Sequence, residues 1–539
     1  MPIQFLPSPD GFEKPMNFQV RLMDLSWRTF LYALLSARQG AGGNQMLEIK
    51  NLTIQLDRED RYLVKDMNLS LAAGEKAVLA GEEGNGKSTL LKAILHQADW
   101  CTVTGEIRLD GPVGCLSQFP SFDGTLADLF DGLPVWNYTD VLTELGIEYG
   151  RLFSSQPFST LSGGEKVRYY LLFLRMQEPD ILLLDEPGND LDIETLDWLE
   201  RFLLLCPQTV LFVSHDETLI EHVHPTILHL EQLHRKSLPR ITRSSLSWPD
   251  YLRFRQASLD HQDQVAAGQR REHKAKMDRW RRVHDAVEHR QNTATRQDPH
   301  KAAALKRKLK SVNAAGRRYE KEQASFREFS DAEEAILTRF DPGIQVSAGK
   351  TILEWQGSVV AGSQILCQKV FLSVKGPGIL GITGHNGAGK STLLRQLHSI
   401  LKERPDLRVG YMPQDYREIL DLSVSAADFL KDWPEARTRL GSMRFTSGEM
   451  NSAMGSLSGG QQAKILFLKM VLDKCNVLLL DEPTRNFSPL SAPVIRQALK
   501  DFGGRIILVS HDRKLLQICD EVLELTPDGL IPDRRFAQD

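Results

Sequence analysis

The sequence lacks the cysteine spacing of a metal site or of a disulfide framework. Its 539 residues include six cysteines, and no two of them form a CxxC pair. This pattern argues against a zinc ribbon, an iron–sulfur cluster and a disulfide-stabilised scaffold, and it favours a protein of the reducing cytoplasm.

The sequence also lacks a hydrophobic run long enough to cross a membrane. A spanning helix needs about 20 consecutive apolar residues, whereas the longest candidate, residues 30–37, is much shorter. Arg21 and Arg28 precede this run and small residues follow it, so the segment faintly resembles a signal peptide. We favour another interpretation of residues 1–45, a disordered N-terminal extension or a misassigned start, because Met46 opens a segment typical of a domain edge.

Nothing in the composition indicates a fibrous or disordered protein. Hydrophobic residues make up 41% of the chain and charged residues 25%, with a formal net charge of −4, and these values are ordinary for a globular protein. A chain of this length exceeds what one hydrophobic core usually supports, so two or three domains are expected.

Four short motifs occur twice in the same order. Gly81–Thr89 recurs as Gly384–Thr392, Leu161–Gly164 as Leu457–Gly460, Leu182–Pro187 as Leu478–Pro483, and Val213–Asp216 as Val509–Asp512. The last three pairs share one offset of 296 residues (161 to 457, for example), and Gln118 and Gln414 share it too. A common register across several motifs indicates a duplicated domain.

Each copy alternates short apolar strands with helices. Lys76–Ala80 is predicted to be a strand that leads into the first glycine-rich loop, and Ser88–Leu95 to be the helix that follows. Further buried strands are predicted at Ile181–Leu184 and Val210–Val213 in copy one, and at Val477–Leu480 and Ile506–Val509 in copy two. Continuous apolar strands between helices predict an α/β fold with a largely parallel sheet in each copy.

The motif GxxxxGK[ST] after a strand predicts a phosphate-binding P-loop. Its glycines allow backbone N–H groups to surround phosphates at the start of a helix. Lys87 and Lys390 are predicted to reach the β- and γ-phosphates, and Ser88 and Ser391 to bind Mg²⁺. The predicted nucleotide-binding residues of the two loops are Gly81, Glu82, Glu83, Gly84, Asn85, Gly86, Lys87, Ser88 and Thr89, and Gly384, His385, Asn386, Gly387, Ala388, Gly389, Lys390, Ser391 and Thr392.

Two acidic residues end an apolar strand in each copy. Asp185 and Asp481 are predicted to hold the metal ion, directly or through water. Glu186 and Glu482 follow them, and because side chains alternate along a strand, these residues can face the γ-phosphate and polarise a water molecule.

A histidine follows another apolar strand in each copy. A single histidine is more often structural, but His215 and His511 share one register, which favours a contact with the γ-phosphate. We therefore predict catalytic roles for Glu186, Glu482, His215 and His511.

The order of these motifs resembles that of ATP-binding-cassette domains, whose signature is Leu-Ser-Gly-Gly. The resemblance implies that Gln118 and Gln414, in the glutamine loops, belong to the metal sites. It also implies an intramolecular head-to-tail pairing of two cassettes, in which the signature of each copy covers the ATP held by the other copy, because a helix start offers N–H groups to phosphate. The signature residues are Ser162, Gly163 and Gly164 in copy one, and Ser458, Gly459 and Gly460 in copy two.

The two copies differ where family members of the nearest type usually carry a final aspartate. Copy one has Asp192 there and copy two has Ser488, which predicts unequal nucleotide sites. Tyr62 is a candidate for stacking on the base in copy one, and copy two offers no obvious equivalent. The preference for ATP over GTP therefore rests on the resemblance.

A polar, helix-forming segment separates the copies. Residues 249–329 contain few glycines and a break near residues 292–300, which predicts a hairpin of two helices, each roughly 40–50 Å long. The residues expected to pack between the helices are Met277, Trp280, Val283 and Val287 from the first, and Leu305, Leu309 and Val312 from the second.

This linker is strongly basic. Between Arg270 and Lys321 there are 17 Lys and Arg against 6 Asp and Glu, a net charge of +11, so the rest of the chain carries −15. Such an excess favours a polyanion as partner over a solvated coiled coil. The predicted RNA-binding residues are Arg279, Arg281, Arg282, Lys306, Arg307, Lys308 and Lys310.

Two tandem cassettes, no membrane domain and a basic helical hairpin between them resemble the ABC-F family from Met46 to the C-terminus. The resemblance implies a cytoplasmic ATPase that uses ATP and Mg²⁺ and binds the ribosome, with its linker facing rRNA and the P-site tRNA. Its role would be that of a translation factor or of a ribosomal protection factor in antibiotic resistance. The expected boundaries are 46–240 for cassette one, 241–340 for the linker and 341–539 for cassette two.

Two alternatives remain open. One is a soluble ATPase subunit of an ABC transporter, although the distance from the P-loop lysine to the signature, 74 residues in copy one and 67 in copy two, is short for cassettes that dock on membrane subunits. The other is a DNA-repair cassette ATPase, whose usual coiled-coil or zinc insertion within a domain is not visible.

Overall fold

The computed structural model describes most of the chain from Gln45 to Phe536. The described ranges are 45–57, 61–82, 84–118, 120–233, 238–292, 299–323, 326, 340–341, 343–362, 364–443 and 445–536. Apart from Gln45, the interpretation of residues 1–45 lies outside these ranges. No helix within them is long and apolar enough to cross a membrane.

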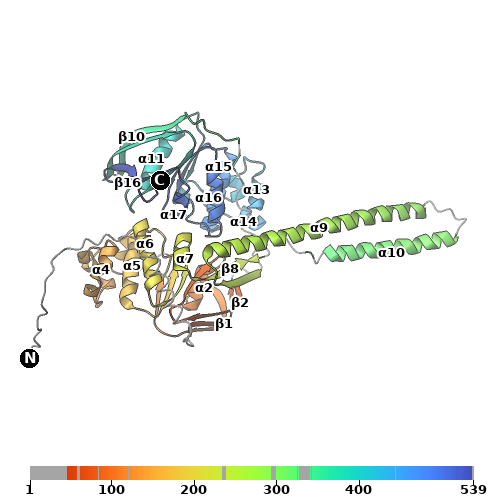
Figure 1. Ribbon diagram of the computed structural model, residues 1–539, viewed down its shortest axis with the longest axis horizontal. Helices are drawn as coiled ribbons and strands as arrows, with labels where there is room; N and C mark the ends of the chain where they lie inside the picture. The colour runs from red at the N-terminus through yellow and green to blue at the C-terminus, as the bar shows by residue number, and fades with distance from the viewer. Residues whose placement is uncertain are drawn as a thin grey trace, which may run out of the picture. The chain divides into compact units, whose positions relative to one another are not determined.

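Cassette one contains two sheets (Figure 1). Its strands are β1 (Gln45–Leu56), β2 (Arg61–Ala72), β3 (Lys76–Ala80), β4 (Cys101–Leu109), β5 (Val113–Leu116), β6 (Ile181–Asp185), β7 (Thr209–Val213), β8 (Thr226–Gln232) and β9 (Leu238–Ser244). The smaller sheet has the order β2-β1-β4, and the larger has the order β5-β6-β7-β3-β8-β9. In the larger sheet only β9 runs antiparallel to its neighbour.

Cassette two repeats the larger sheet. Its strands are β10 (Thr351–Ala361), β11 (Gln364–Lys375), β12 (Gly378–Thr383), β13 (Val409–Met412), β14 (Val477–Asp481), β15 (Arg505–Val509), β16 (Glu521–Thr526) and β17 (Gly529–Pro532). The order β13-β14-β15-β12-β16-β17 matches that of cassette one strand for strand, again with an antiparallel last strand. This match confirms the predicted duplication and the predicted α/β fold with largely parallel sheets.

Helices cover these sheets in both cassettes. Those of cassette one are α2 (Lys87–Ile94), α3 (Leu126–Leu129), α4 (Thr139–Glu144), α5 (Gly163–Gln177), α6 (Ile193–Leu205) and α7 (Glu217–Val223). Those of cassette two are α11 (Lys390–Lys402), α12 (Ala426–Phe429), α13 (Ala436–Ser442), α14 (Ser447–Asn451), α15 (Gly459–Leu472), α16 (Ala492–Lys500) and α17 (Arg513–Leu516). Short 3₁₀ turns lie at Val135–Tyr138, Tyr149–Phe153, Phe158–Thr160, Tyr416–Glu418 and Met454–Ser456.

The central strands are buried on both faces, which explains why their sequences do not alternate. In β6, Ile181 and Leu183 belong to one hydrophobic core, whereas Leu182 and Leu184 belong to a second core on the opposite face. The strands predicted from these apolar runs are confirmed to within one residue at each end.

The linker is a hairpin of α9 (Trp248–Asn292) and α10 (Pro299–Gln323), which pack against each other (Figure 1). At 1.5 Å per residue the 45 residues of α9 extend about 67 Å and the 25 residues of α10 about 37 Å. The predicted length of 40–50 Å for each helix was therefore wrong. The predicted position of the first helix, from residue 249 to a break near 292, agrees with α9.

Contacts between the two linker helices differ in part from the prediction. The indole N–H of Trp280 donates to the carbonyl of Val312 at 2.7 Å, and Val287 is buried. Val283 is instead 42% exposed, although it lies one turn from Val287 on the same side of α9.

The first turns of α9 are anchored on β8. Trp248 and Tyr251 are almost fully buried in the core of cassette one. The hydroxyl of Tyr251 lies 2.6 Å from Nδ1 of His229, and burial lowers the pKa of His229 to about 3. The linker is therefore rooted in the same strand whose Leu230 carbonyl accepts a hydrogen bond from the P-loop residue Asn85 at 3.1 Å.

Candidate functional site

The two P-loops share one backbone geometry. The glycine before each lysine, Gly86 or Gly389, has a left-handed conformation with φ of 95° and 99°. A Cβ at these positions would lie 3.1 Å from Leu63 and 2.9 Å from Leu366. Only glycine therefore allows the loop to close against the neighbouring strand.

Each P-loop lysine folds back onto its own loop. Nζ of Lys87 donates to the carbonyl oxygens of Gly81 and Glu82 at 2.8 and 2.9 Å, and Lys390 makes the equivalent bonds at 2.7 and 3.0 Å. Both lysines are buried. A buried ammonium group needs polar or anionic partners, so this environment fits the predicted contact with phosphate.

The predicted metal ligands of each copy lie together. Asp185 and Asp481 are buried at the ends of β6 and β14, and each lies near its P-loop serine, Ser88 or Ser391, whose hydroxyl acts to lower the pKa of the aspartate. One carboxylate oxygen of each aspartate has no hydrogen-bond partner among the described residues. Burial raises the pKa of both carboxyl groups. Hydroxyl and carboxylate oxygens suit Mg²⁺, so the residues fit the predicted ion.

The glutamates that follow do not continue the strands. Glu186 and Glu482 have left-handed backbone conformations, with φ of 52° and 50°. The chain therefore turns directly after the aspartate, and this turn, not the strand alternation assumed from the sequence, separates the two acids. Such a conformation is costly for a non-glycine residue and is typical of functional sites.

Glu186 lies in a dense hydrogen-bond network. Its Oε1 is 2.8 Å from Nε2 of His215, and its Oε2 accepts from Gln118 at 3.3 Å and from Asn189. Burial would raise the pKa of Glu186, but the charges of His215 and Lys87 outweigh it and lower the pKa to about 2. Gln118, predicted as a metal residue, thus contacts the predicted base.

His215 also reaches the other cassette. Its Nδ1 lies 2.5 Å from the carbonyl oxygen of Phe487. A carbonyl only accepts, and so does an ionised carboxylate. Both ring nitrogens of His215 therefore donate when Glu186 is ionised, which makes the histidine a cationic bridge between Glu186 and cassette two.

Glu482 has a looser environment. It accepts from the hydroxyl of Ser510 at 3.3 Å and from the backbone N–H of His511 at 3.4 Å, and Nε2 of His511 is 3.9 Å away. Burial, together with the carboxylate of Asp481, raises the pKa of Glu482 to about 7. The two predicted bases therefore differ in both their contacts and their charge environment.

Asn189 and Arg485 occupy equivalent positions after the two glutamates but make different contacts. Asn189 binds Glu186 within its own cassette, whereas Arg485, its counterpart in the shared register, pairs with Asp190 of cassette one at 2.8 Å. The carbonyl of Asp190 also accepts from the P-loop residue Asn386. Cassette one therefore touches the P-loop of cassette two directly.

The difference between Asp192 and Ser488 is visible in their contacts. Asp192 caps α6 and lies 3.6 Å from Nδ1 of His385 in the opposite P-loop. Ser488 is buried, and its hydroxyl is 3.0 Å from that of Ser491 in its own cassette. These contacts support the predicted inequality of the two sites.

A cavity of about 1250 Å³ lies between the cassettes. It brings the signature of copy one to the P-loop of copy two, as head-to-tail pairing requires. The predicted site residues that line it are Gln118, Ser162, Gly163, Gly164, Glu186, His215, Asn386, Gly387, Gly389, Lys390, Ser391, Thr392, Gln414, Gly459, Asp481, Glu482 and His511. The reverse pairing would bring the signature of copy two to the P-loop of copy one. Of the residues of that pairing, the described lining contains Gly459 but no P-loop residue of copy one.

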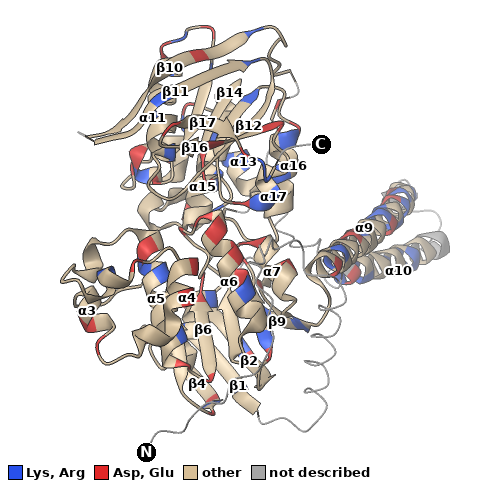
Figure 2. Ribbon diagram, turned by 60° about the vertical axis from the view of Figure 1, so that its left-hand side comes forward, with Lys and Arg blue, Asp and Glu red and all other residues tan. Residues whose placement is uncertain are grey.

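The seven predicted RNA-binding residues are all exposed. Arg279, Arg281 and Arg282 lie on α9, and Lys306, Arg307, Lys308 and Lys310 lie on α10. Figure 2 shows basic positions along both helices, with acidic ones between them. The linker therefore offers cationic side chains that cassette residues do not cover.

Sequence reasoning missed several residues of the sites. Arg61 donates to the carbonyl of the P-loop residue Gly84 at 3.1 Å, and Arg485 and Asp190 join the cassettes. Comparison of the two copies at the offset of 296 could have found Arg485, because it replaces Asn189. Tyr62, the candidate for stacking on the base, precedes Leu63, which packs on the P-loop. Glu83, a predicted nucleotide-binding residue, lies outside the described residues.

Comparisons with known proteins agree with this architecture. The ABC transporter family profile matches residues 64–189 and 367–485. Human "ATP-binding cassette sub-family F member 3" is 26% identical over 90% of this chain and 72% of its own length. "Protein GCN20" of Saccharomyces cerevisiae is 28% identical over 88% of this chain and 70% of its own length.

A solved structure shows the same fold. An archaeal ribosome recycling factor, aABCE1, crystallised with the ribosomal stalk protein aP1, has a TM-score of 0.58 at 16% identity over 90% of each chain.

Proposed function

Because the chain belongs to the ABC-F family of tandem ATP-binding-cassette ATPases, we propose that it is a cytoplasmic, ribosome-associated translation factor. In this proposal ATP joins the two cassettes, hydrolysis separates them, and the linker contacts rRNA and the P-site tRNA. Protection of the ribosome from antibiotics is the specialised form of the same activity. The exposed basic linker between the cassettes carries the proposal.

The sites support this cycle through their own residues. Lys87 and Lys390 would hold the phosphates of ATP, and Mg²⁺, bound by the aspartate and serine of each copy, would supply charge neutralisation. Glu186 and Glu482 would orient and polarise water. Because Asp190 and Asp192 already touch the opposite P-loop, a nucleotide bound there would sense whether the cassettes are closed.

The linker supports a nucleic-acid partner through its charge and its anchor. A net charge of +11 on exposed helices provides the counterion-releasing contacts that phosphates favour. Trp248 and Tyr251 fix the start of α9 on cassette one. A rigidly rooted helix of about 67 Å would carry its far end to a distant part of a large partner.

The test is ribosome pelleting across a salt series, with ATP, ADP or no nucleotide. Changing Lys306, Arg307, Lys308 and Lys310 to Glu should weaken binding and flatten the dependence of log K on log salt, by about one unit for each phosphate that the variant no longer binds. ATP turnover without ribosomes should remain, because these residues lie outside both nucleotide sites. A matched control reverses four exposed basic residues of cassette two, Lys369, Lys375, Lys402 and Lys431.

Unchanged ribosome binding in the linker variant would contradict the proposal and leave the linker a spacer. A shortened hairpin end, without residues 293–298, should retain binding but lose the effect on translation. Pelleting with membranes instead of ribosomes would support the transporter-subunit alternative.

A further inference from the structure

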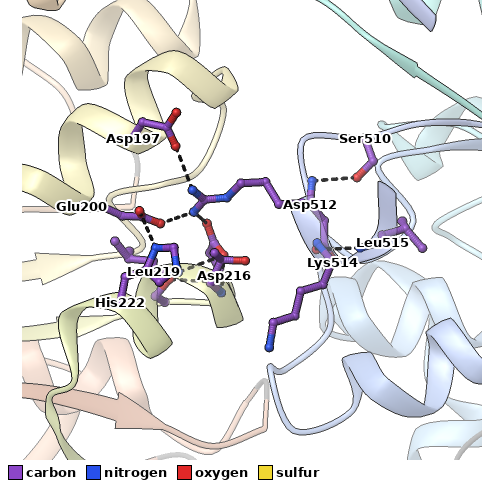
Figure 3. Close-up of polar contacts among 12 residues, drawn as sticks. Asp197, Glu200, Asp216, Leu219, His222, Ser510, Asp512, Lys514 and Leu515 are labelled. Carbon is purple, nitrogen blue, oxygen red and sulfur yellow. Dashed lines mark hydrogen bonds and ion pairs between the residues drawn. The ribbon is translucent and has the colours of Figure 1, made fainter. Parts of the chain in front are cut away.

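Charged side chains of opposite sign meet where the cassettes touch. We call this set the charge junction. Its acids come from cassette one and are Asp197, Glu200, Asp216, Glu217 and Glu221, and its bases come from cassette two and are Arg496, Arg513 and Lys514. Figure 3 shows Asp197, Glu200 and Asp216 on one side of the junction and Lys514 on the other.

The pair between Glu217 and Arg496 is bidentate and buried. Its two N–H···O distances are 2.7 and 3.1 Å, and the side chains are only 4% and 13% exposed. Lys514 adds a contact to Glu217 at 3.2 Å and pairs with Glu221. Ion pairs that are this well shielded from water depend strongly on both partners.

Arg513 is surrounded by three acids. Its guanidinium lies 2.9 Å from Asp197, 3.2 Å from Asp216, and also contacts Glu200. Removal of this arginine would therefore leave several carboxylates facing one another.

The contacts are reciprocal in the register of the duplication. At the offset of 296 residues, Glu200 corresponds to Arg496 and Glu217 corresponds to Arg513. Glu217 binds Arg496, and its counterpart Arg513 binds Glu200, the counterpart of Arg496. These two contacts are thus equivalents of each other with reversed polarity, which is the arrangement expected around a pseudo-twofold axis.

This reversal of charge penalises the pairing of like cassettes. Two copies of cassette one in the same geometry would place Glu217 against Glu200, and two copies of cassette two would place Arg513 against Arg496. Like charges shielded from water repel strongly, and such repulsion is a common source of binding specificity.

We propose that the charge junction selects a cassette with the cationic face of cassette two as the partner of cassette one, and excludes pairing between like cassettes. The linker raises the effective concentration of the partner within the same chain, so the chain closes on itself. This inference concerns the pairing of the cassettes and holds whether or not the chain binds ribosomes.

Two double variants test the proposal in the full-length chain. Glu200→Arg with Glu217→Arg gives cassette one the residues of cassette two, and Arg496→Glu with Arg513→Glu does the reverse. Each should lose at least about tenfold in ATP turnover. Each should also lose hydrogen-exchange protection at residues 186–200 and 482–496 with ATP and Mg²⁺.

Opposite charges can be restored in two ways. The quadruple variant, which combines all four substitutions, should turn over ATP faster than either double variant, although Asp197, Glu221 and Lys514 remain in their original cassettes. Mixing the two double variants should give 1:1 dimers with recovered turnover, because the basic cassettes of one chain then meet the acidic cassettes of the other. Light scattering would detect these dimers.

Arg439→Glu is the matched control, because Arg439 pairs with Glu435 on the surface of cassette two and should leave turnover unchanged. Far-UV circular dichroism would verify folding of every variant. The proposal is overturned if the double variants turn over ATP like the wild type. It is also overturned if turnover is restored neither in the quadruple variant nor by mixing the two double variants.

Discussion

At the scale of single residues, the two glutamates after the metal-site aspartates differ in how firmly they are held. His215, Gln118 and Asn189 all contact Glu186, whereas the nearest ring nitrogen to Glu482 is 3.9 Å away. A general base acts only when it is positioned on the water that it polarises. The better-positioned carboxylate should therefore carry more of the turnover.

Substitution of the two glutamates with glutamine tests this difference. The double variant should bind ATP but lose about 10²- to 10⁴-fold in turnover, as is typical when a general base is removed. Of the single variants, Glu186→Gln should reduce the steady-state ATPase rate several-fold more than Glu482→Gln. Equal effects would show that the different surroundings of the two sites do not influence catalysis, and a double variant at the wild-type rate would show that neither glutamate is the base.

Much of the candidate site could be predicted at this scale because phosphate and metal binding require particular residues at fixed spacing. The P-loop lysines, Asp185 and Asp481 follow directly from such motifs. The left-handed turn at Glu186 could not be predicted, because nothing in a glutamate favours that conformation. The pair between Arg485 and Asp190 was equally hidden, since it depends on how two domains meet.

At the scale of elements, the linker shows what hydrophobic periodicity leaves undetermined. The polar, helix-forming composition predicted two helices, and both exist. The start of α9 at Trp248 lies within one residue of the predicted start of the helix-forming segment. The length of the first helix was nevertheless misjudged, because the predicted segment from residue 249 to the break near 292 already spans about 66 Å at 1.5 Å per residue.

One glycine lies within each linker helix, Gly268 in α9 and Gly316 in α10. Their surroundings predict opposite responses to substitution with alanine. Gly316 lies against Trp280, and an added Cβ would be 2.8 Å from the indole ring, whereas a Cβ at Gly268 would meet no described atom within 4 Å. Glycine within a helix costs up to about 1 kcal/mol relative to alanine. Gly268→Ala should therefore stabilise α9, and Gly316→Ala should push the helices apart.

Limited proteolysis of the linker would distinguish these responses. Gly268→Ala should slow cleavage within the hairpin, and Gly316→Ala should accelerate it in spite of the better helix propensity. Slower cleavage in both variants would mean that intrinsic propensity outweighs the packing of Trp280 against α10.

At the scale of the whole molecule, each cassette inserts one apolar side chain into the core of the other. Leu490 of cassette two belongs to the hydrophobic cluster of cassette one, and Ile193 of cassette one belongs to the cluster of cassette two. Both residues are almost fully buried. The cassettes therefore share packing as well as the charge junction, and a loss of packing in one should be felt in the other.

Leu490→Ala tests this coupling because it changes cassette two while the cavity that it leaves opens against cassette one. A buried leucine-to-alanine change typically costs about 2–5 kcal/mol, and here that cost should fall on the pairing of the cassettes. Hydrogen exchange should become faster in α5 and α6 of cassette one. Leu499→Ala is the control, since Leu499 is buried in the core of cassette two itself, and its substitution should speed exchange in that cassette alone. If Leu490→Ala left the exchange of cassette one unchanged, the two cores would be independent, and the charge junction with the nucleotide contacts would have to hold the cassettes together without help from shared packing.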